Sequence, residues 1–256
     1  MRVVIKIGTS TLTHATGNLN IRLVEELCKI ISDVKNAGNE VIMVSSGAIA
    51  MGVSKLALEK RPKDIPTKQA AAAVGQCELM YFYDKLFSDY RQTVAQVLII
   101  ADDLRNSKRA VHFGNTMERL LELGAIPVIN ENDTVATDEL TVSDNDTLSA
   151  IVAVTVKADL LILLSDIDGL YSADPHIDPT ARLIPVVEEI TDDIDGVAGG
   201  SISGLGTGGM ATKVRAAKMC MESGTDMVIA NGANPHILYD IVDGKRVGTK
   251  FIGKKQ

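Results

Sequence analysis

The stretch NAGNEVIMVSSGA, residues 36–48, decides the fold, because it contains one complete junction of helix, glycine, strand and polar turn. Gly38 suits the left-handed residue that ends a helix, and VIMV (41–44) is a short apolar run typical of a buried strand. The same order returns as ELGAIPVIN (122–130) and ESGTDMVIA (222–230), whose predicted strands are IPVI (126–129) and MVIA (227–230). Three such junctions indicate alternating helices and strands with a mostly parallel sheet.

Further apolar runs complete the predicted sheet. VVIKI (3–7), VAQVLII (94–100) and LLILL (160–164) have the length and composition of strands. Segment 21–36 has helical periodicity, and these apolar side chains share one face: Val24, Leu27, Cys28, Ile31, Val34. We therefore expect an α/β fold, a three-layer α/β/α sandwich with a mostly parallel central sheet. The stretch 174–203, with three prolines and GVAGGSIS, is expected to be the most irregular region and a candidate mobile flap.

The composition of the chain restricts the class of protein. The 256 residues are 46% hydrophobic and contain no linker or low-complexity segment, so we expect one continuous domain over residues 1–256. A net charge of −7 without a long basic block argues against nucleic-acid and membrane partners. The apolar runs are strand-sized and Lys6 interrupts the first, so we expect no signal segment, no membrane span and a cytoplasmic protein.

Cysteine and histidine give no sign of a metal centre. The three cysteines are odd in number and widely spaced, so small buried apolar side chains are the favoured interpretation of Cys28, Cys77 and Cys220. The histidines lie far apart without metal-ligand spacing and are interpreted as surface or cap residues: His14, His112, His176, His236. No metal site made by the protein alone is predicted.

Polar turns follow the predicted strands. They read KIGTST (6–11), VSSGA (44–48), INENDT (129–134), LSDIDG (164–169) and IANG (229–232). Ligands of open parallel sheets collect where strands end and helices begin. We therefore expect these turns to converge on one site at one edge of the sheet.

Two lysines stand out by their surroundings. Lys6 lies inside an apolar strand, where an unpaired ammonium group is unfavourable, and the donors of GTST follow it at once; snorkelling at the sheet edge is the alternative. Lys213 ends GLGTGGMATK (204–213), whose glycine N–H groups suit an anion at a helix start; an exposed helix lysine is the alternative. The same glycines satisfy G-x-G-x-x-G but do not follow a strand, and the spacing fails for a Walker A loop.

Acidic and amide side chains accompany the lysines. One of the first two residues of SDNDT (143–147) is expected to cap a helix, which leaves Asp146 to orient lysines and Asn145 to donate to a substrate carboxylate. In INENDT, Asp133 is a candidate counter-ion for an amine, with a turn-forming role as the alternative. Phosphoryl transfer needs positioned charge more than a general base, so these groups favour phosphate chemistry.

Taken together, these segments resemble the glutamate 5-kinases of the amino-acid kinase family. The resemblance rests on motifs spread over the chain: KIGTS, VSSGAIAMG, QAAAAVGQ, INENDTVAT, SDNDTLSAIVA, LLSDIDGLYSADP, GTGGMATKVRAA and VGTKF. GTGGM with a following lysine is also similar to acetylglutamate kinase, whereas SSGAIA with INEND separates the two.

The resemblance implies transfer of the ATP γ-phosphoryl group to the side-chain carboxylate of L-glutamate, which begins proline synthesis, with Mg²⁺ bound through the nucleotide phosphates. It implies Lys6, Lys213 and Asp146 as catalytic residues. It also implies a glutamate site at Ser46, Gly47, Asp133 and Asn145 in a half of roughly 1–150. The ATP-binding half, roughly 151–256, completes a nucleotide site at Lys6, Gly8, Thr9, Ser165, Asp166, Thr207, Gly208, Gly209, Met210, Ala211, Thr212 and Lys213.

Several expectations concern partners and alternatives. Many chains of this resemblance continue into a carboxyl-terminal PUA-type domain, whereas this sequence ends at Gln256, and we expect the kinase core to be complete. Feedback inhibition by L-proline and a homo-oligomer, dimer or tetramer, are implied. The alternatives are a kinase acting on N-acetylglutamate or aspartate, a nucleotide-binding regulator without turnover, and a dehydrogenase.

Overall fold

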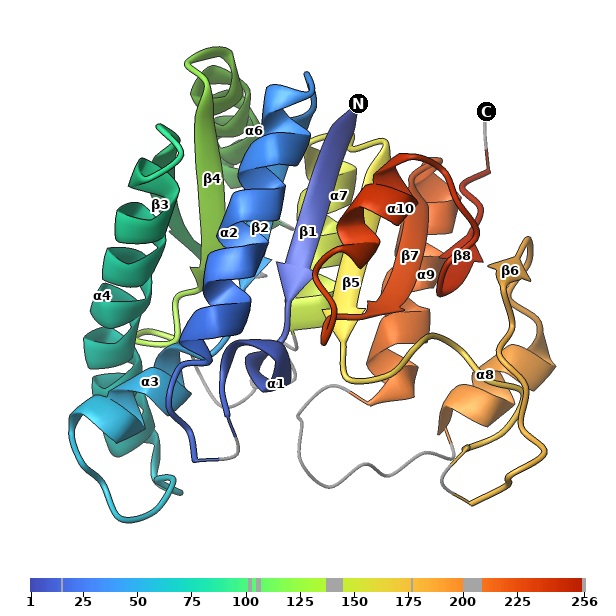
Figure 1. Ribbon diagram of the computed structural model, residues 1–256, viewed down its shortest axis with the longest axis horizontal. Coiled ribbons are helices and arrows are strands. Elements are labelled where there is room, and N and C mark those ends of the chain that lie inside the picture. Colours follow the sequence, from blue (N-terminus) through green and yellow to red (C-terminus); the bar gives the residue numbers. More distant parts are fainter. Residues whose placement is uncertain are drawn as a thin grey trace.

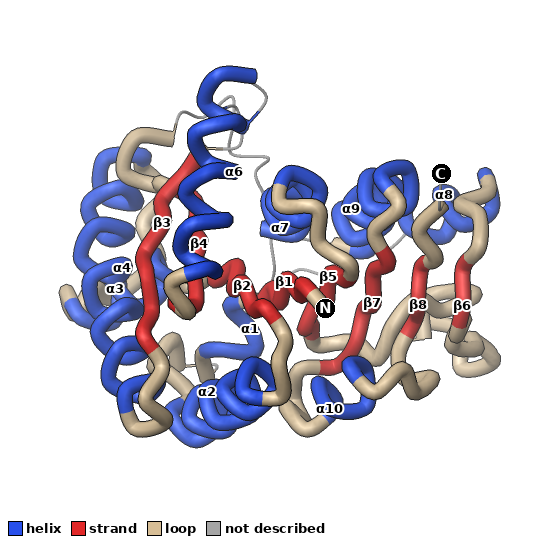
Figure 2. The backbone as a smooth tube through the Cα atoms, turned by 90° about the horizontal axis from the view of Figure 1, so that it is seen from above, coloured by secondary structure: helices blue, strands red, loops and turns tan. Residues whose placement is uncertain are grey.

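The computed structural model describes residues 1–14, 16–100, 103–104, 107–136, 145–175, 177–199 and 209–254. Within these ranges the chain forms one eight-stranded sheet with helices on both faces (Figure 1). Figure 2 shows the layers from above, with helices on either side of the row of strands. The expected α/β/α sandwich is confirmed.

The sheet is parallel except at one edge. Its order is β3-β4-β2-β1-β5-β7-β8-β6. The strands are β1 (Arg2–Ile7), β2 (Glu40–Ser45), β3 (Thr93–Ile99), β4 (Ala125–Glu131), β5 (Leu160–Ser165), β6 (Val186–Val187), β7 (Asp226–Asn231) and β8 (Thr249–Phe251). The first six in spatial order pair in parallel, β8 runs antiparallel to β7, and β6 pairs in parallel with β8. The carboxyl ends of the six parallel strands therefore meet at one edge.

Helices cover both faces of the sheet. In Figure 2, α6, α7 and α9 lie on one side of the strands, and α2 and α10 lie on the other. The short helices α1 and α3 lie at the lower edge in Figure 1, where the strand arrows end. The bounds are α1 (Thr9–Leu12), α2 (Ile21–Asn36), α3 (Ala48–Lys55), α4 (Ile65–Ser88), α6 (Ser107–Glu122), α7 (Asn145–Thr155), α8 (Asp192–Gly199), α9 (Met210–Ser223) and α10 (Ile237–Val242).

Two hydrophobic cores lie on opposite faces of the sheet, because successive strand residues point to opposite sides. In β1, Val4 packs with the α7 and α9 side, whereas Val3 and Ile5 pack with the α2 side. Lys6 stands two residues after Val4 and so shares its face. Strand alternation thus directs this lysine toward α7 and α9.

The strands and caps expected from the sequence are present. All six predicted strands are found with bounds that differ by at most two residues. Helix α2 covers 21–36 as predicted, and Gly38 follows it with φ +95°, the left-handed conformation expected there. Neither β6 nor β8 was predicted, because strands of two or three residues carry no periodicity.

One expectation needs correction, and another is tested only in part. The described residues of the stretch 174–203 form β6 and α8 and no further helix or strand, while residues 176 and 200–203 lie outside the described ranges, so the mobile flap stays a prediction. Cys28 and Cys220 are buried as expected, but Cys77 is exposed because it lies on the outer face of α4. Among the described helices, none is long and apolar enough to cross a membrane.

Candidate active site

The predicted site residues gather at the carboxyl edge of the parallel strands. Strand β1 lies between β2 and β5. The strands that follow in the sequence are placed first on the β2 side of β1 and then on its β5 side, so the strand order reverses at β1. Open parallel sheets bind their ligands outside the strand ends at such a switch point. Lys6 of β1 lies at this position, and α7 and α9 bring further charged groups to it.

A buried cluster of three charges forms the centre of the site. The Lys6 Nζ lies 2.7 Å from Asp146 Oδ1, and the Lys213 Nζ lies 3.0 Å from Asp146 Oδ2. Thr212 adds a hydrogen bond from its Oγ1 to the same Oδ2, at 3.0 Å. Residues far apart in the sequence, on β1, α7 and α9, therefore hold one carboxylate between two ammonium groups.

The cluster carries a net positive charge in a poorly solvated place. Lys6, Lys213 and Asp146 are 9%, 5% and 1% exposed. Burial alone would raise the pKa of Asp146, but the two ammonium groups outweigh it and hold that pKa below its ordinary value. Asp146 is therefore ionised at neutral pH, and among the described residues of the cluster two ammonium groups face one carboxylate, an arrangement suited to an anionic ligand.

The backbone around the cluster leaves room for such an anion. A Cβ added to Gly8 would lie 3.5 Å from the Lys6 Nζ and 3.8 Å from the Ser10 Oγ, so the absent side chain would face this lysine. Helix α9 begins after Gly209 without a side-chain cap. Its first N–H groups and its positive dipole end add to the charge of Lys213. These features fit the triphosphate of a nucleotide.

Other predicted nucleotide contacts surround this place. Ser165 is buried at the end of β5, and its Oγ donates to Asp166 Oδ1 at 3.0 Å. Thr9 begins α1 directly after Gly8. Met210, Ala211 and Thr212 form the first turn of α9, while Thr207 and Gly208 lie outside the described residues. Within the described ranges, no group of three or more His, Cys, Asp and Glu side chains is arranged to hold a metal ion.

A hydrogen-bonded network forms the opposite side of the site. Asn145 Nδ2 donates to Ser45 O at 2.8 Å, to Ser46 Oγ at 2.6 Å and, more weakly, to Asn130 Oδ1 at 3.2 Å. The described contacts of the Asn145 amide lie within the protein, and its predicted donation to a substrate carboxylate stays a prediction. Because Ser46 Oγ accepts from Asn145, its hydroxyl hydrogen can point to another acceptor.

Gly47 shapes the turn that carries Ser46. Gly47 directly precedes α3 and has φ +95°, a backbone conformation that residues other than glycine rarely adopt. A Cβ there would lie 3.9 Å from Thr9 Cγ2, which places the turn beside α1. The turns after β1 and β2 therefore lie side by side.

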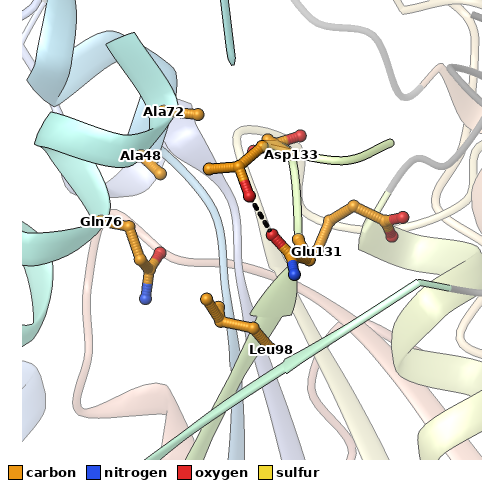
Figure 3. Close-up of a pocket in the computed structure, with 8 residues that line it drawn as sticks. Ala48, Ala72, Gln76, Leu98, Glu131 and Asp133 are labelled. Carbon is orange, nitrogen blue, oxygen red and sulfur yellow. Dashed lines mark hydrogen bonds between the residues drawn. The ribbon is translucent and has the colours of Figure 1, made fainter. Parts of the chain in front are cut away.

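Asp133 lies in the turn after β4, half-buried beside a small cavity. Burial raises the pKa of this carboxyl group, and the charge of Arg61 opposes the rise only in part. Figure 3 shows Asp133 and Glu131 on one side of the cavity and Gln76 on the other. The cavity is lined by Ala48, Ala72, Gln76, Leu98, Glu131, Asn132, Asp133 and Thr134.

Two residues of this network were missed by sequence reasoning. Asn130 accepts from Asn145 and donates its Nδ2 to Gln76 Oε1 at 2.9 Å. The two missed residues are Asn130, which lies within INENDTVAT, and Gln76, which lies within QAAAAVGQ. Neither residue is charged. The available signal was a polar side chain at a position of α4 that shares the buried helical face with Leu79 and Tyr83.

The fold and the site define a class of phosphate-transferring enzyme, and comparison with known proteins agrees. The profile of the amino acid kinase family matches residues 1–231, and the chain belongs to this family. Carbamate kinase from Giardia lamblia bound to AMP-PNP has a TM-score of 0.71 at 16% identity, covering 99% of this chain and 98% of that one. The isopentenyl phosphate kinase of T. acidophilum has a TM-score of 0.66 at 19% identity, covering 98% and 100%. At such identities these structures show the fold alone.

Relatives with higher sequence identity identify the group within this family to which the chain belongs. Glutamate 5-kinase of Clostridium perfringens is 51% identical over 99% of this chain and 96% of its own length. That of Clostridium acetobutylicum is 52% identical over 100% and 96%. That of Caldanaerobacter subterraneus is 50% identical over 100% of this chain and 68% of its own length. Within the amino acid kinases, the chain belongs with the glutamate 5-kinases.

Proposed function

We propose that this protein transfers the γ-phosphoryl group of ATP to the side-chain carboxylate of L-glutamate, giving L-glutamyl 5-phosphate and ADP. The observation that carries the proposal is the buried cluster of Lys6, Asp146 and Lys213 at the switch point of the sheet. Its net positive charge suits a phosphoryl group in transfer. The glutamate 5-kinases among its relatives supply the acceptor.

The reaction needs no general base. An oxygen of the glutamate side chain, already ionised at neutral pH, attacks the γ-phosphorus and forms a new O–P bond. The bond from that phosphorus to the β,γ-bridging oxygen breaks, and ADP leaves with the electron pair. Lys6 and Lys213 neutralise the charge on the phosphate oxygens, and Asp146 holds both ammonium groups in position.

Mg²⁺ is proposed to bind through the phosphate oxygens of ATP and through water, because this ion keeps several waters and uses substrate phosphates as ligands. When bound, it supplies further neutralisation of the triphosphate charge. Asp146, Ser165 and Asp166 are the polar residues that would face this complex in the proposed arrangement. Of these, Asp146 already pairs with both lysines, so its role toward the nucleotide is to hold them.

The acceptor is proposed to lie between the cluster and the turn after β4. The Ser46 hydroxyl and the Gly47 turn face one end of it, and Asp133 pairs with the α-ammonium group. N-acetylglutamate has no ammonium group, so the half-buried Asp133 would lose this interaction. The pocket should therefore select a free amino acid. The two proposed halves of the domain then meet at the cluster, since Lys6 and Asp146 come from 1–150 and Lys213 comes from 151–256.

The test is a hydroxamate assay with purified protein, MgATP and hydroxylamine, comparing glutamate, N-acetylglutamate and aspartate. An acyl phosphate reacts with hydroxylamine, and we expect hydroxamate with glutamate alone. Product from N-acetylglutamate would assign another substrate, and ADP release without hydroxamate from any acceptor would refute carboxylate phosphorylation. Ser46→Ala should raise KM for glutamate, whereas the control Ser223→Ala, at the far end of α9, should not.

Three finer features are proposed with the function. L-proline should inhibit the enzyme, which initial rates at increasing proline would measure. The protein should assemble as a homo-oligomer, dimer or tetramer, which light scattering after gel filtration would measure. A cytoplasmic location is expected and can be checked by cell fractionation.

A further inference from the structure

A buried glutamine beside the proposed acceptor site has an amide nitrogen without a hydrogen-bond partner among the described residues. Gln76 lies on α4 and is 8% exposed. Its Oε1 accepts from Asn130, but its Nε2 is fully buried and donates to no described atom. A buried donor left unsatisfied is unfavourable, so such a group in a folded protein needs an explanation.

The orientation of this amide is fixed by a backbone group. The backbone N–H of Glu131 can only donate, and it donates to Asn130 Oδ1 at 2.9 Å. Asn130 must therefore present its Nδ2 to Gln76, at 2.9 Å, and Gln76 must answer with its oxygen. Exchanging the nitrogen and oxygen of either side chain would break this chain of bonds. The nitrogen of Gln76 is therefore directed away from Asn130.

The helix that carries Gln76 packs closely against the helix that follows the Ser46 turn. A Cβ on Gly75 would lie 1.7 Å from the carbonyl oxygen of Ala48, and a Cβ on Gly52 would lie 1.8 Å from that of Ala71. Helices α3 and α4 thus touch backbone to backbone, which only glycine permits. Gln76 follows this crossing directly, so its place relative to the turn before α3 is set by close packing.

Gln76 lines the small cavity shown in Figure 3. Gln76 forms one wall, Ala48 and Ala72 lie above it, Leu98 lies below, and Glu131 and Asp133 lie across from it. The space available to the centre of a water molecule is about 10 Å³, which is room for one water. Polar groups of the turn formed by residues 132–134 line the opposite wall, so one water here would have several partners.

We propose that Gln76 is a positioning residue for the acceptor amino acid. Its oxygen holds Asn130, which in turn holds Asn145 and Ser46. Its nitrogen donates to a single water that bridges to the turn of Asp133. Both ends of the acceptor site therefore depend on this one side chain, whereas no described contact joins it to the Lys6, Asp146 and Lys213 cluster. The proposal rests on the proposed function and predicts control of glutamate affinity, not of ATP affinity.

The test compares Gln76→Met with a matched control, Gln92→Met. Gln92 is also 8% exposed and hydrogen-bonded, accepting from Lys35 Nζ at 2.8 Å and donating to Asn36 Oδ1 at 2.9 Å, but it lies just before β3. We expect Gln76→Met to raise KM for glutamate about tenfold, the effect of losing one well-placed hydrogen bond, with KM for ATP and kcat nearly unchanged. Gln92→Met should leave both KM values unchanged.

Two further measurements separate positioning from general destabilisation. The stabilisation of the melting temperature by glutamate alone should be weakened by Gln76→Met and not by Gln92→Met, and Gln76→Leu should behave as Gln76→Met does. Combined with Asn130→Ala, Gln76→Met should add little to the rise in KM, because both act through one chain of bonds.

Equal glutamate KM in the two glutamine variants would overturn the proposal, as would equal rises in both KM values or full additivity with Asn130→Ala. A wild-type protein that makes no hydroxamate from glutamate would overturn the proposed function instead. That failure is visible before any variant is compared.

Discussion

Replacing Asp146 by Asn is the most direct perturbation of the charge cluster. The change keeps the shape of the side chain and removes the charge that lies 2.7 Å from one buried ammonium group and 3.0 Å from the other. Because Lys6 and Lys213 are 9% and 5% exposed, water can replace little of the lost attraction. Removing one partner from a buried ion pair lowers the free energy of unfolding by about 3–5 kcal/mol. For a chain of this size that corresponds to a fall in Tm of about 10 °C.

Nucleotide should reverse part of this loss, since the triphosphate brings negative charge to the same two lysines. Thermal unfolding measured with and without a saturating non-hydrolysable ATP analogue should show a smaller gap between Asp146→Asn and wild type when the analogue is present. Turnover should fall by about 10² to 10³, because the lysines lose the group that orients them. The matched control is Glu122→Gln, whose surface pair with Arg119 should contribute less than about 1 kcal/mol. An Asp146→Asn variant with wild-type stability and near wild-type turnover would refute the assigned role of the cluster.

Three further outcomes follow from the structure. Lys213→Ala should lower kcat by about 10² to 10³ at saturating substrates, and turnover near the wild-type value would contradict its role in transfer. Burial raises the pKa of Asp133, so this carboxylate should become protonated as the pH falls, beginning above the usual aspartate pKa of about 4. Protonation removes the charge that pairs with the substrate ammonium group, so KM for glutamate should rise. In Asp133→Asn, which has no such group, KM should not change over the same pH range. Gly75→Ala should lower the free energy of unfolding by about 1–3 kcal/mol or more, because the added methyl group would clash with Ala48. Gly114→Ala has open space around the added methyl group and should raise the free energy of unfolding by about 0.5–1 kcal/mol. Chemical denaturation measures both values.

Most of the fold could be predicted because its signals are local. The parallel strands are apolar runs of six or seven residues bounded by polar turns, and Gly38 marks a helix end by the conformation that it alone adopts easily. The edge strands β6 and β8 carry no such signal, since they pair through the backbone over two or three residues. Their existence depends on tertiary contacts that periodicity does not report.

The charged part of the site was also accessible from sequence, whereas the neutral part was not. Lys6 is conspicuous because it interrupts an apolar strand, Lys213 because it follows a glycine-rich turn at a helix start, and Asp146 because capping needs only one residue of its cluster. That one carboxylate binds both lysines follows only from the placement of β1, α7 and α9. Gln76 and Asn130 have no charge to draw attention, and their role emerges from hydrogen bonds across α4 and β4.

The central place of β1 has a consequence for how the chain is made. Its Arg2 to Ile7 pair with β2 along one side, but the other side pairs with β5, which begins only at Leu160. At translation speeds of about 5–20 residues per second, the first strand off the ribosome waits about 8–30 seconds with an apolar edge open to other nascent chains. Lys6 likewise meets its carboxylate partner, Asp146, only after α7 has emerged.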